Sequence, residues 1–177
     1  MLKLSNCFWH PNIDVNLENQ EGKSPFSLGC RCGAVSVVQV LLKDPRVDVT
    51  LDDYKGCTSL WGASWKGKRE VIEWLVASGR DLGDIKNKKG KNWDGEGWKE
   101  YTSLEIARKH RRSEVASVLE RFMINPVLTR HELRVKLGVL DKLAAEAFFN
   151  PPRLPNKTLH QPFDSLILLP NCPWSYR

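Results

Sequence analysis

The chain has 177 residues, of which 41% are hydrophobic and 27% charged, and it carries a formal net charge of +6. This is the composition of an ordinary globular protein with a mild preference for acidic partners. No apolar run approaches the roughly 18 residues that a membrane-spanning helix needs, and five cysteines do not form a disulfide framework, which favours a reduced, cytoplasmic setting.

Residues 1–17 are predicted to be the end of a structural repeat whose beginning is missing. Pro11 and Asp14 recur 34 residues later as Pro45 and Asp48. Because a stack of repeats normally begins with a polar capping unit, we interpret this segment as a truncated leading repeat. The alternative is that the chain pairs with another molecule at this end.

Residues 18–84 contain two copies of one helix–turn–helix unit. In the second copy, Thr58 is placed to cap a short helix, and a second helix with a wide apolar stripe follows the turn. The turn glycines and apolar residues of the first copy recur 34 positions later: Gly22, Gly33, Val37 and Leu41 become Gly56, Gly67, Val71 and Leu75. Such units bury their apolar faces only by stacking on one another.

A third copy follows at residues 102–124, where the T-S-L of Thr58–Leu60 returns after 44 residues instead of 34. About ten residues are therefore inserted before it, within residues 85–101. Glycines and lysines make a helix there unfavourable, so we expect an extended, exposed loop, although its rings at Trp93, Trp98 and Tyr101 argue against simple disorder.

The helix openings S-P-F-S-L-G, T-S-L-W-G-A and T-S-L-E-I-A resemble the T-P-L-H-x-A signature of the ankyrin repeat, without its histidine. The resemblance implies an all-α fold, an α-solenoid of three stacked helix–turn–helix ankyrin repeats over residues 18–126. It also implies a protein–protein interaction module, a scaffold or adaptor without catalytic activity, whose concave face of finger tips and first helices binds another protein.

Two further segments follow the repeats. Residues 127–149 are predicted to form a C-terminal capping helix, which we expect to begin at a capping box made by Thr129 and Glu132. Residues 150–177 are rich in proline and have no periodic pattern, so a disordered tail is predicted. Translated non-coding sequence is the alternative for this last segment.

The sequence gives no catalytic, metal or cofactor site. Gly22-Lys23-Ser24 lacks the upstream glycine of a phosphate-binding loop. Cys30 and Cys32 are two apart on a helix and so point away from each other. The four histidines have no acid and nucleophile at a recognisable spacing. We therefore predict no catalytic residue, no metal and no cofactor.

Carried over by position, the resemblance places the partner-binding face at ten residues: Arg31, Tyr54, Lys55, Trp65, Lys66, Trp98, Lys99, Tyr101, Lys109 and His110. Aromatic rings beside cations are typical of binding hot spots. The other interpretation of Trp98 and Tyr101 is that these rings only fold the insertion back onto its neighbours.

Residues 86–112 contain nine basic and four acidic side chains, a local excess of +5. We predict a monomer that binds an acidic segment of another protein there, and that charge reversal at Lys99 and Lys109 weakens this binding. Nucleic-acid binding through residues 86–112 is the alternative function; it is expected to be weak because no groove-reading helix is recognisable. No membrane is involved, and a nuclear location is the alternative to the cytoplasm.

Overall fold

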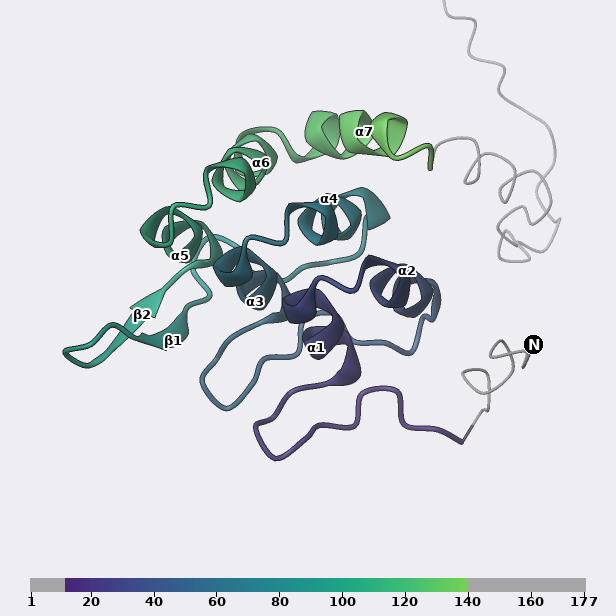
Figure 1. Ribbon diagram of the computed structural model, residues 1–177. Helices are drawn as coiled ribbons and strands as arrows, with labels where there is room; N and C mark the ends of the chain where they lie inside the picture. The colour runs from purple at the N-terminus through teal and green to yellow at the C-terminus, as the bar shows by residue number, and fades with distance from the viewer. Residues whose placement is uncertain (1–11, 140–177) are drawn as a thin grey trace, which may run out of the picture.

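The computed structural model describes residues 12–139, within which seven helices and two short strands are found. Three helix pairs and a seventh helix stack along the chain, as Figure 1 shows. The elements run in the order α1 (Pro25–Cys32), α2 (Val35–Lys43), α3 (Ser59–Lys66), α4 (Arg69–Ser78), β1 (Gly90–Trp93), β2 (Trp98–Tyr101), α5 (Ser103–Lys109), α6 (Ser113–Ile124) and α7 (Pro126–Lys136).

Each first helix starts at a hydroxyl cap. The side chains of Ser24, Thr58 and Thr102 accept hydrogen bonds from backbone N–H groups three residues later. The tight turn into the second helix needs a left-handed residue, which is Gly33 in the first pair and Gly67 in the second. In the third pair Arg111 takes this role at a φ of 56°.

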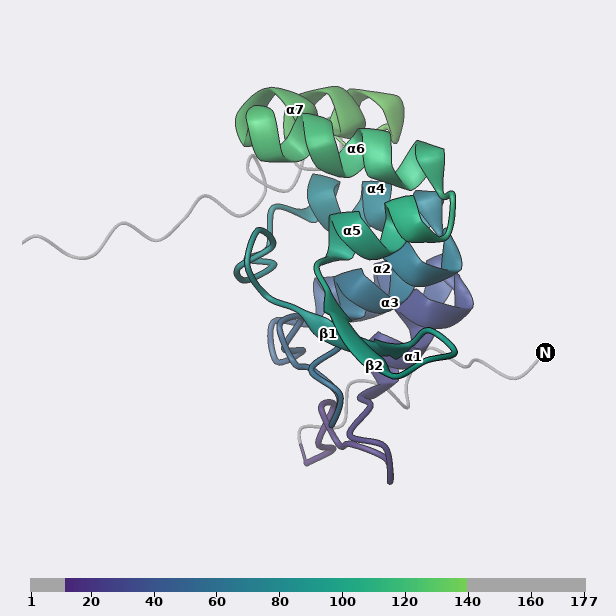
Figure 2. The ribbon, with the colours of Figure 1, turned by 90° about the vertical axis from the view of Figure 1, so that its left-hand side faces the viewer.

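The helices form two layers. The inner layer is α1, α3 and α5, and the outer layer is α2, α4 and α6, as Figures 1 and 2 show. The core between them is dominated by apolar side chains of the outer helices, including Val38, Leu41, Val71, Ile72, Leu75, Val115 and Leu119. The apolar stripe of each second helix is therefore what these helices bury in the core.

The loops that follow the outer helices are joined from one repeat to the next. Asn16 donates to the backbone carbonyl of Arg46 and accepts from the N–H of Asp48, at 2.8 Å in both cases. One repeat later, Arg80 donates to the carbonyls of Asp44, at 3.1 Å, and Val47. Side chains therefore tie successive repeats together along this edge.

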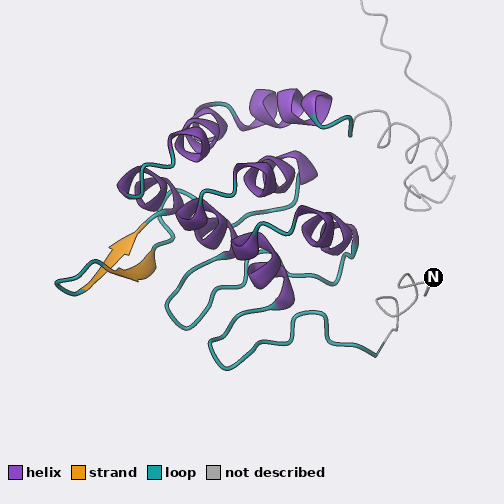
Figure 3. Cartoon of the chain, viewed as in Figure 1, coloured by secondary structure: helices purple, strands orange, loops and turns teal. Residues whose placement is uncertain are grey.

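The all-α prediction is wrong at the insertion, which is not an extended loop. Residues 90–101 form an antiparallel hairpin in which Gly90 pairs with Tyr101 and Trp93 with Trp98. The Asp94 carboxylate accepts hydrogen bonds from the N–H groups of Glu96 and Gly97 and so closes the turn. Figure 3 shows this hairpin as the one sheet in the described part of the chain.

The start predicted for the last helix is also wrong. The α7 helix begins at Pro126, with Asn125 as its cap, while Thr129 is buried inside the helix. The helix lies against α4 and α6 (Figure 2). Lys136 reaches the buried carboxylate of Glu73 at 2.6 Å.

Several sequence-based predictions fall on residues outside the described range. These are the leading residues 1–11 of the truncated repeat, the end of the predicted capping helix at 140–149, and the proline-rich tail at 150–177. No helix within residues 12–139 is both long and apolar enough to cross a membrane.

Candidate functional site

The hairpin is anchored to the inner helix layer by a small second core. Cys57, Trp61 and Ile106 are buried together, with Trp65 and Tyr101 packed against them. The Trp61 indole N–H donates to the backbone carbonyl of Tyr101 at 2.8 Å. The hairpin therefore packs on α3 and α5 and covers part of the inner helix layer.

The register of the hairpin gives it two chemically different faces. Residues that pair directly across the strands share a face, and successive residues alternate between faces. Tyr101 and Lys99 therefore lie on one face. Tyr101 is turned towards α5, because its hydroxyl lies 2.6 Å from Lys109 Nζ. Trp98 and Lys91 lie on the opposite face.

The inner group of candidate residues centres on Trp65 of α3. The guanidinium of Arg31 lies 4.6 Å from the centre of its ring, and the Lys66 ammonium lies 4.2 Å away. His110 meets the same ring edge-on, with centroids 6.2 Å apart. Three consecutive inner helices thus converge on one aromatic side chain.

The surroundings of His110 favour its neutral form. Burial lowers the pKa of His110 below its ordinary value of 6.5, and the nearby charges of Lys109, Arg112 and Lys66 lower the pKa further. Its Nε2 atom is buried and has no hydrogen-bond partner among the described residues.

The cations among the candidate residues differ in whether they are already paired. Lys99 lies 2.6 Å from the Asp94 carboxylate, which lowers the pKa of Asp94 to about 2. Lys109 is 3.8 Å from the same carboxylate. By contrast, Arg31 and Lys66 form no ion pair within residues 12–139, so both remain available to a ligand.

The outer group lies on the other face of the hairpin, next to the second finger. Tyr54 and Trp98 are 74% and 54% exposed. The Lys55 ammonium lies 4.5 Å from the centre of the Trp98 ring. A groove of about 470 Å³ runs between them and is lined by Tyr54, Lys55, Lys91, Trp98 and Glu100.

The ten predicted residues therefore form two groups rather than one surface. Six are brought together around Trp65 and the inner side of the hairpin: Arg31, Trp65, Lys66, Tyr101, Lys109 and His110. Tyr54, Lys55 and Trp98 form the outer group, and Lys99 pairs with the hairpin turn. Their role in binding stays a prediction.

The structure places the two rings of the insertion, Tyr101 and Trp98, in different surroundings. Tyr101 packs against the second core and helps to fold the hairpin back onto α3 and α5. Trp98 stays exposed and contacts Trp93 edge-on at 5.8 Å between ring centres. Trp93 is 56% exposed and was missed as a candidate. The signal available in the sequence was its position opposite Trp98 across an Asp-Gly turn.

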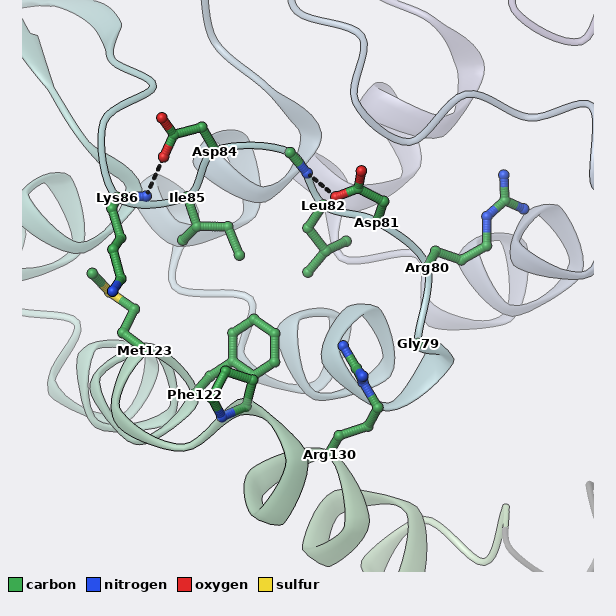
Figure 4. Close-up of a pocket in the computed structure, with 12 residues that line it drawn as sticks. Gly79, Arg80, Asp81, Leu82, Asp84, Ile85, Lys86, Phe122, Met123 and Arg130 are labelled. Carbon is green, nitrogen blue, oxygen red and sulfur yellow. Dashed lines mark hydrogen bonds between the residues drawn. The ribbon is translucent and has the colours of Figure 1, made fainter.

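A second cavity, of about 450 Å³, was not predicted (Figure 4). It lies between the loop after α4 and the junction of α6 and α7. Leu82, Ile85, Phe122 and Met123 give it apolar walls, and Arg130 lies at its edge. The cavity exists because the chain turns into α7 at Pro126 instead of laying another loop beside residues 79–86.

The described residues offer little reactive chemistry. Burial raises the pKa of the Cys57 thiol to about 12, with the nearby Asp53 adding to the shift, and burial also raises the pKa of Cys30. Both thiols are therefore held in their unreactive protonated form. Within residues 12–139 no group of three His, Cys, Asp or Glu side chains is placed to hold a metal ion.

Comparison with known proteins supports the repeat interpretation. Residues 3–89 match the family model for ankyrin repeats in three copies. A stretch of 68 residues, 38% of the chain, is 31% identical to ankyrin repeat and SAM domain-containing protein 6 of Rattus norvegicus, and the Mus musculus protein matches equally well. The match spans about 8% of the length of these relatives. The helix pairs, their turn glycines and this match lead to the same assignment, and the chain is an ankyrin-repeat protein.

Proposed function

We propose that this protein binds an acidic segment of another protein on the concave face formed by its inner helices and fingers. Ankyrin repeats are in general protein–protein interaction modules. The observation that carries the proposal is the Trp65 group. There Arg31 and Lys66 stack on one partly buried ring and form no ion pair with another described residue.

The physical reason for an acidic ligand is that the positive charges of Arg31 and Lys66 are held in position but are not neutralised by an ion pair. A cation held over an aromatic ring is positioned at little further entropic cost, because the ring already restricts its side chain. Carboxylates arriving at this group gain two ion pairs, with Arg31 and Lys66. Adaptor function without catalysis, in the cytoplasm, is part of the same proposal.

The test uses a fluorescent 12-residue peptide of alternating glutamate and leucine, with a glutamine-for-glutamate peptide as its control. Binding is measured by anisotropy across a salt series. We expect the acidic peptide to bind and the double variant Arg31→Glu/Lys66→Glu to lose at least tenfold in affinity. Raising the salt concentration is expected to weaken binding by screening.

A matched charge reversal gives the control. Lys43 is exposed at the end of α2, in the outer layer, so Lys43→Glu changes the net charge without touching the Trp65 group. Lys99→Glu is expected to have a smaller effect than Lys66→Glu, because Lys99 is already paired with Asp94. Lack of binding, equal losses in the Lys43 and Lys66 variants, or tighter binding of a single-stranded oligonucleotide would each contradict the proposal.

A further inference from the structure

The finger tips and the face of the hairpin that carries Trp98 form a second surface. Neighbouring fingers are hydrogen-bonded through their backbones: the Tyr54 N–H donates to the Glu21 carbonyl at 3.3 Å, and the Lys91 N–H donates to the Lys55 carbonyl at 2.9 Å. The Tyr54 ring lies over Gly22, where a Cβ would come within 2.6 Å of it. The groove beside the hairpin is therefore built on a fixed backbone.

We propose that this groove, lined by Tyr54, Lys55, Lys91, Trp98 and Glu100, is a second docking site, for an extended, proline-containing acidic segment of a partner protein. It is distinct from the Trp65 group, because Trp98 and Lys91 lie on the face of the hairpin opposite to Tyr101. A protein with both sites can hold two segments at once.

The exposed rings are the first reason for a proline-containing ligand. Tyr54 and Trp98 expose large apolar areas that the chain itself does not cover. Proline-rich segments dock on aromatic-lined grooves of this kind, and they do so at low entropic cost because they are already extended.

The hydrogen-bonding character of the groove is the second reason. The Tyr54 hydroxyl and the Trp98 indole N–H have no partner among the described residues, and the Lys55 and Lys91 ammonium groups have no ion pair there. The groove therefore offers donors. Each proline in a strand lacks a backbone N–H group but keeps its carbonyl acceptor, so a proline-containing strand has an excess of acceptors that complements the groove.

The charge of the groove favours an acidic peptide over a nucleic acid. Two lysines face one carboxylate, that of Glu100, which is in no ion pair with another described residue. A nucleic acid carries a phosphate at every nucleotide and would bring one close to Glu100, which repels it, whereas a peptide can place one acidic residue at the lysines and a side-chain donor at Glu100. In addition, one approach to the Trp98 ring is occupied by Lys55, which obstructs base stacking there.

The experiment is a selection from a random peptide library displayed on phage. The library is panned on the wild-type protein and counter-selected on the double variant Tyr54→Ala/Trp98→Ala. We expect recovered sequences to be enriched in proline with a nearby Asp or Glu. Synthetic versions are expected to bind at least tenfold more weakly to the double variant.

A second pair of variants distinguishes binding at this groove from binding at the Trp65 group. Lys55→Glu/Lys91→Glu keeps both rings and is expected to lose binding of the recovered peptides, whereas Arg31→Glu/Lys66→Glu is expected to retain it. The alternating glutamate–leucine peptide should show the reverse pattern. Recovery of no groove-dependent peptide, enrichment without proline or acid, or preferential binding of a thymidine oligonucleotide to the groove would overturn the proposal.

Discussion

Leu75 shows how far single side chains of the outer helices determine stability. It lies in α4 with 1% of its surface exposed. Leu75→Ala is expected to cost about 2–5 kcal/mol of unfolding free energy, because it removes buried apolar surface and leaves a cavity. Urea denaturation measures this loss. The matched control is Val40→Ala in α2, where the side chain is 48% exposed, and equal midpoints for the two variants would contradict the assignment of the core.

His110 is expected to make the stability of the fold depend on pH. Burial and the neighbouring cations hold its folded-state pKa below 6.5, so the unfolded chain takes up a proton at a higher pH than the folded chain does. The stability is therefore complete above about pH 6.5 and falls as the pH drops through the folded-state pKa. Thermal denaturation between pH 7.5 and 5 measures it. His110→Gln should flatten this part of the profile, and an unchanged profile would refute the argument.

The hairpin is the element that the sequence did not reveal. Its lysines and glycines indicated an exposed segment, and five of its eight strand residues are exposed, whereas only Gly90 is buried. What fixes the hairpin is contact with residues about 30 to 40 positions earlier, Cys57 and Trp61. Spacing along the chain carries no signal for such contacts, and the split of the candidate site into two groups follows from them.

The sequence contains the signal for the start of α7, but the prediction placed that start too late. Asn125 followed by Pro126 is a helix start in its own right, since Asn caps well and proline suits the first turn. The capping-box pattern of Thr129 and Glu132 competed with it. The structure uses Thr129 as a buried interior residue and pairs Glu132 with Arg121 of α6. Local patterns therefore predicted the helices themselves better than their boundaries.

Gly90 is expected to control how tightly the hairpin docks on α3. A Cβ at this position would lie 2.8 Å from Cys57 Sγ and 3.1 Å from the Trp61 ring, so Gly90→Ala forces the strand away from the helix. We expect a loss of about 1–3 kcal/mol, with faster hydrogen exchange across residues 90–101. Gly97→Ala is the control, because no atom lies within 4 Å of its added Cβ. Similar exchange in both variants would show that the hairpin is not held at Gly90.

At the scale of the whole molecule, each repeat is coupled to the next by side chains that reach backbone carbonyls. Arg80, which follows α4 in the second repeat, donates hydrogen bonds to the Leu42 and Asp44 carbonyls at the end of α2 in the first repeat. Arg134 of α7 donates to the Ala77 carbonyl at the end of α4, at 2.7 Å. Guanidinium groups at helix C-termini satisfy carbonyls that have no partner within the helix, and they complement the helix dipole. The same device thus joins the first repeat to the second and α7 to the second repeat.

Arg80→Met tests whether this coupling makes the stack unfold as one unit. Methionine keeps most of the apolar stem but loses the donors to the carbonyls of Leu42, Asp44 and Val47. We expect a loss of about 1–3 kcal/mol, and amides of α1 and α2 should exchange faster than those of α5 and α6, because the first repeat then opens on its own. The control is Arg108→Met, which breaks an exposed pair with Glu120 inside a single repeat and is expected to cost less than about 1 kcal/mol. Uniformly faster exchange throughout the stack would mean that Arg80 contributes stability without coupling the repeats.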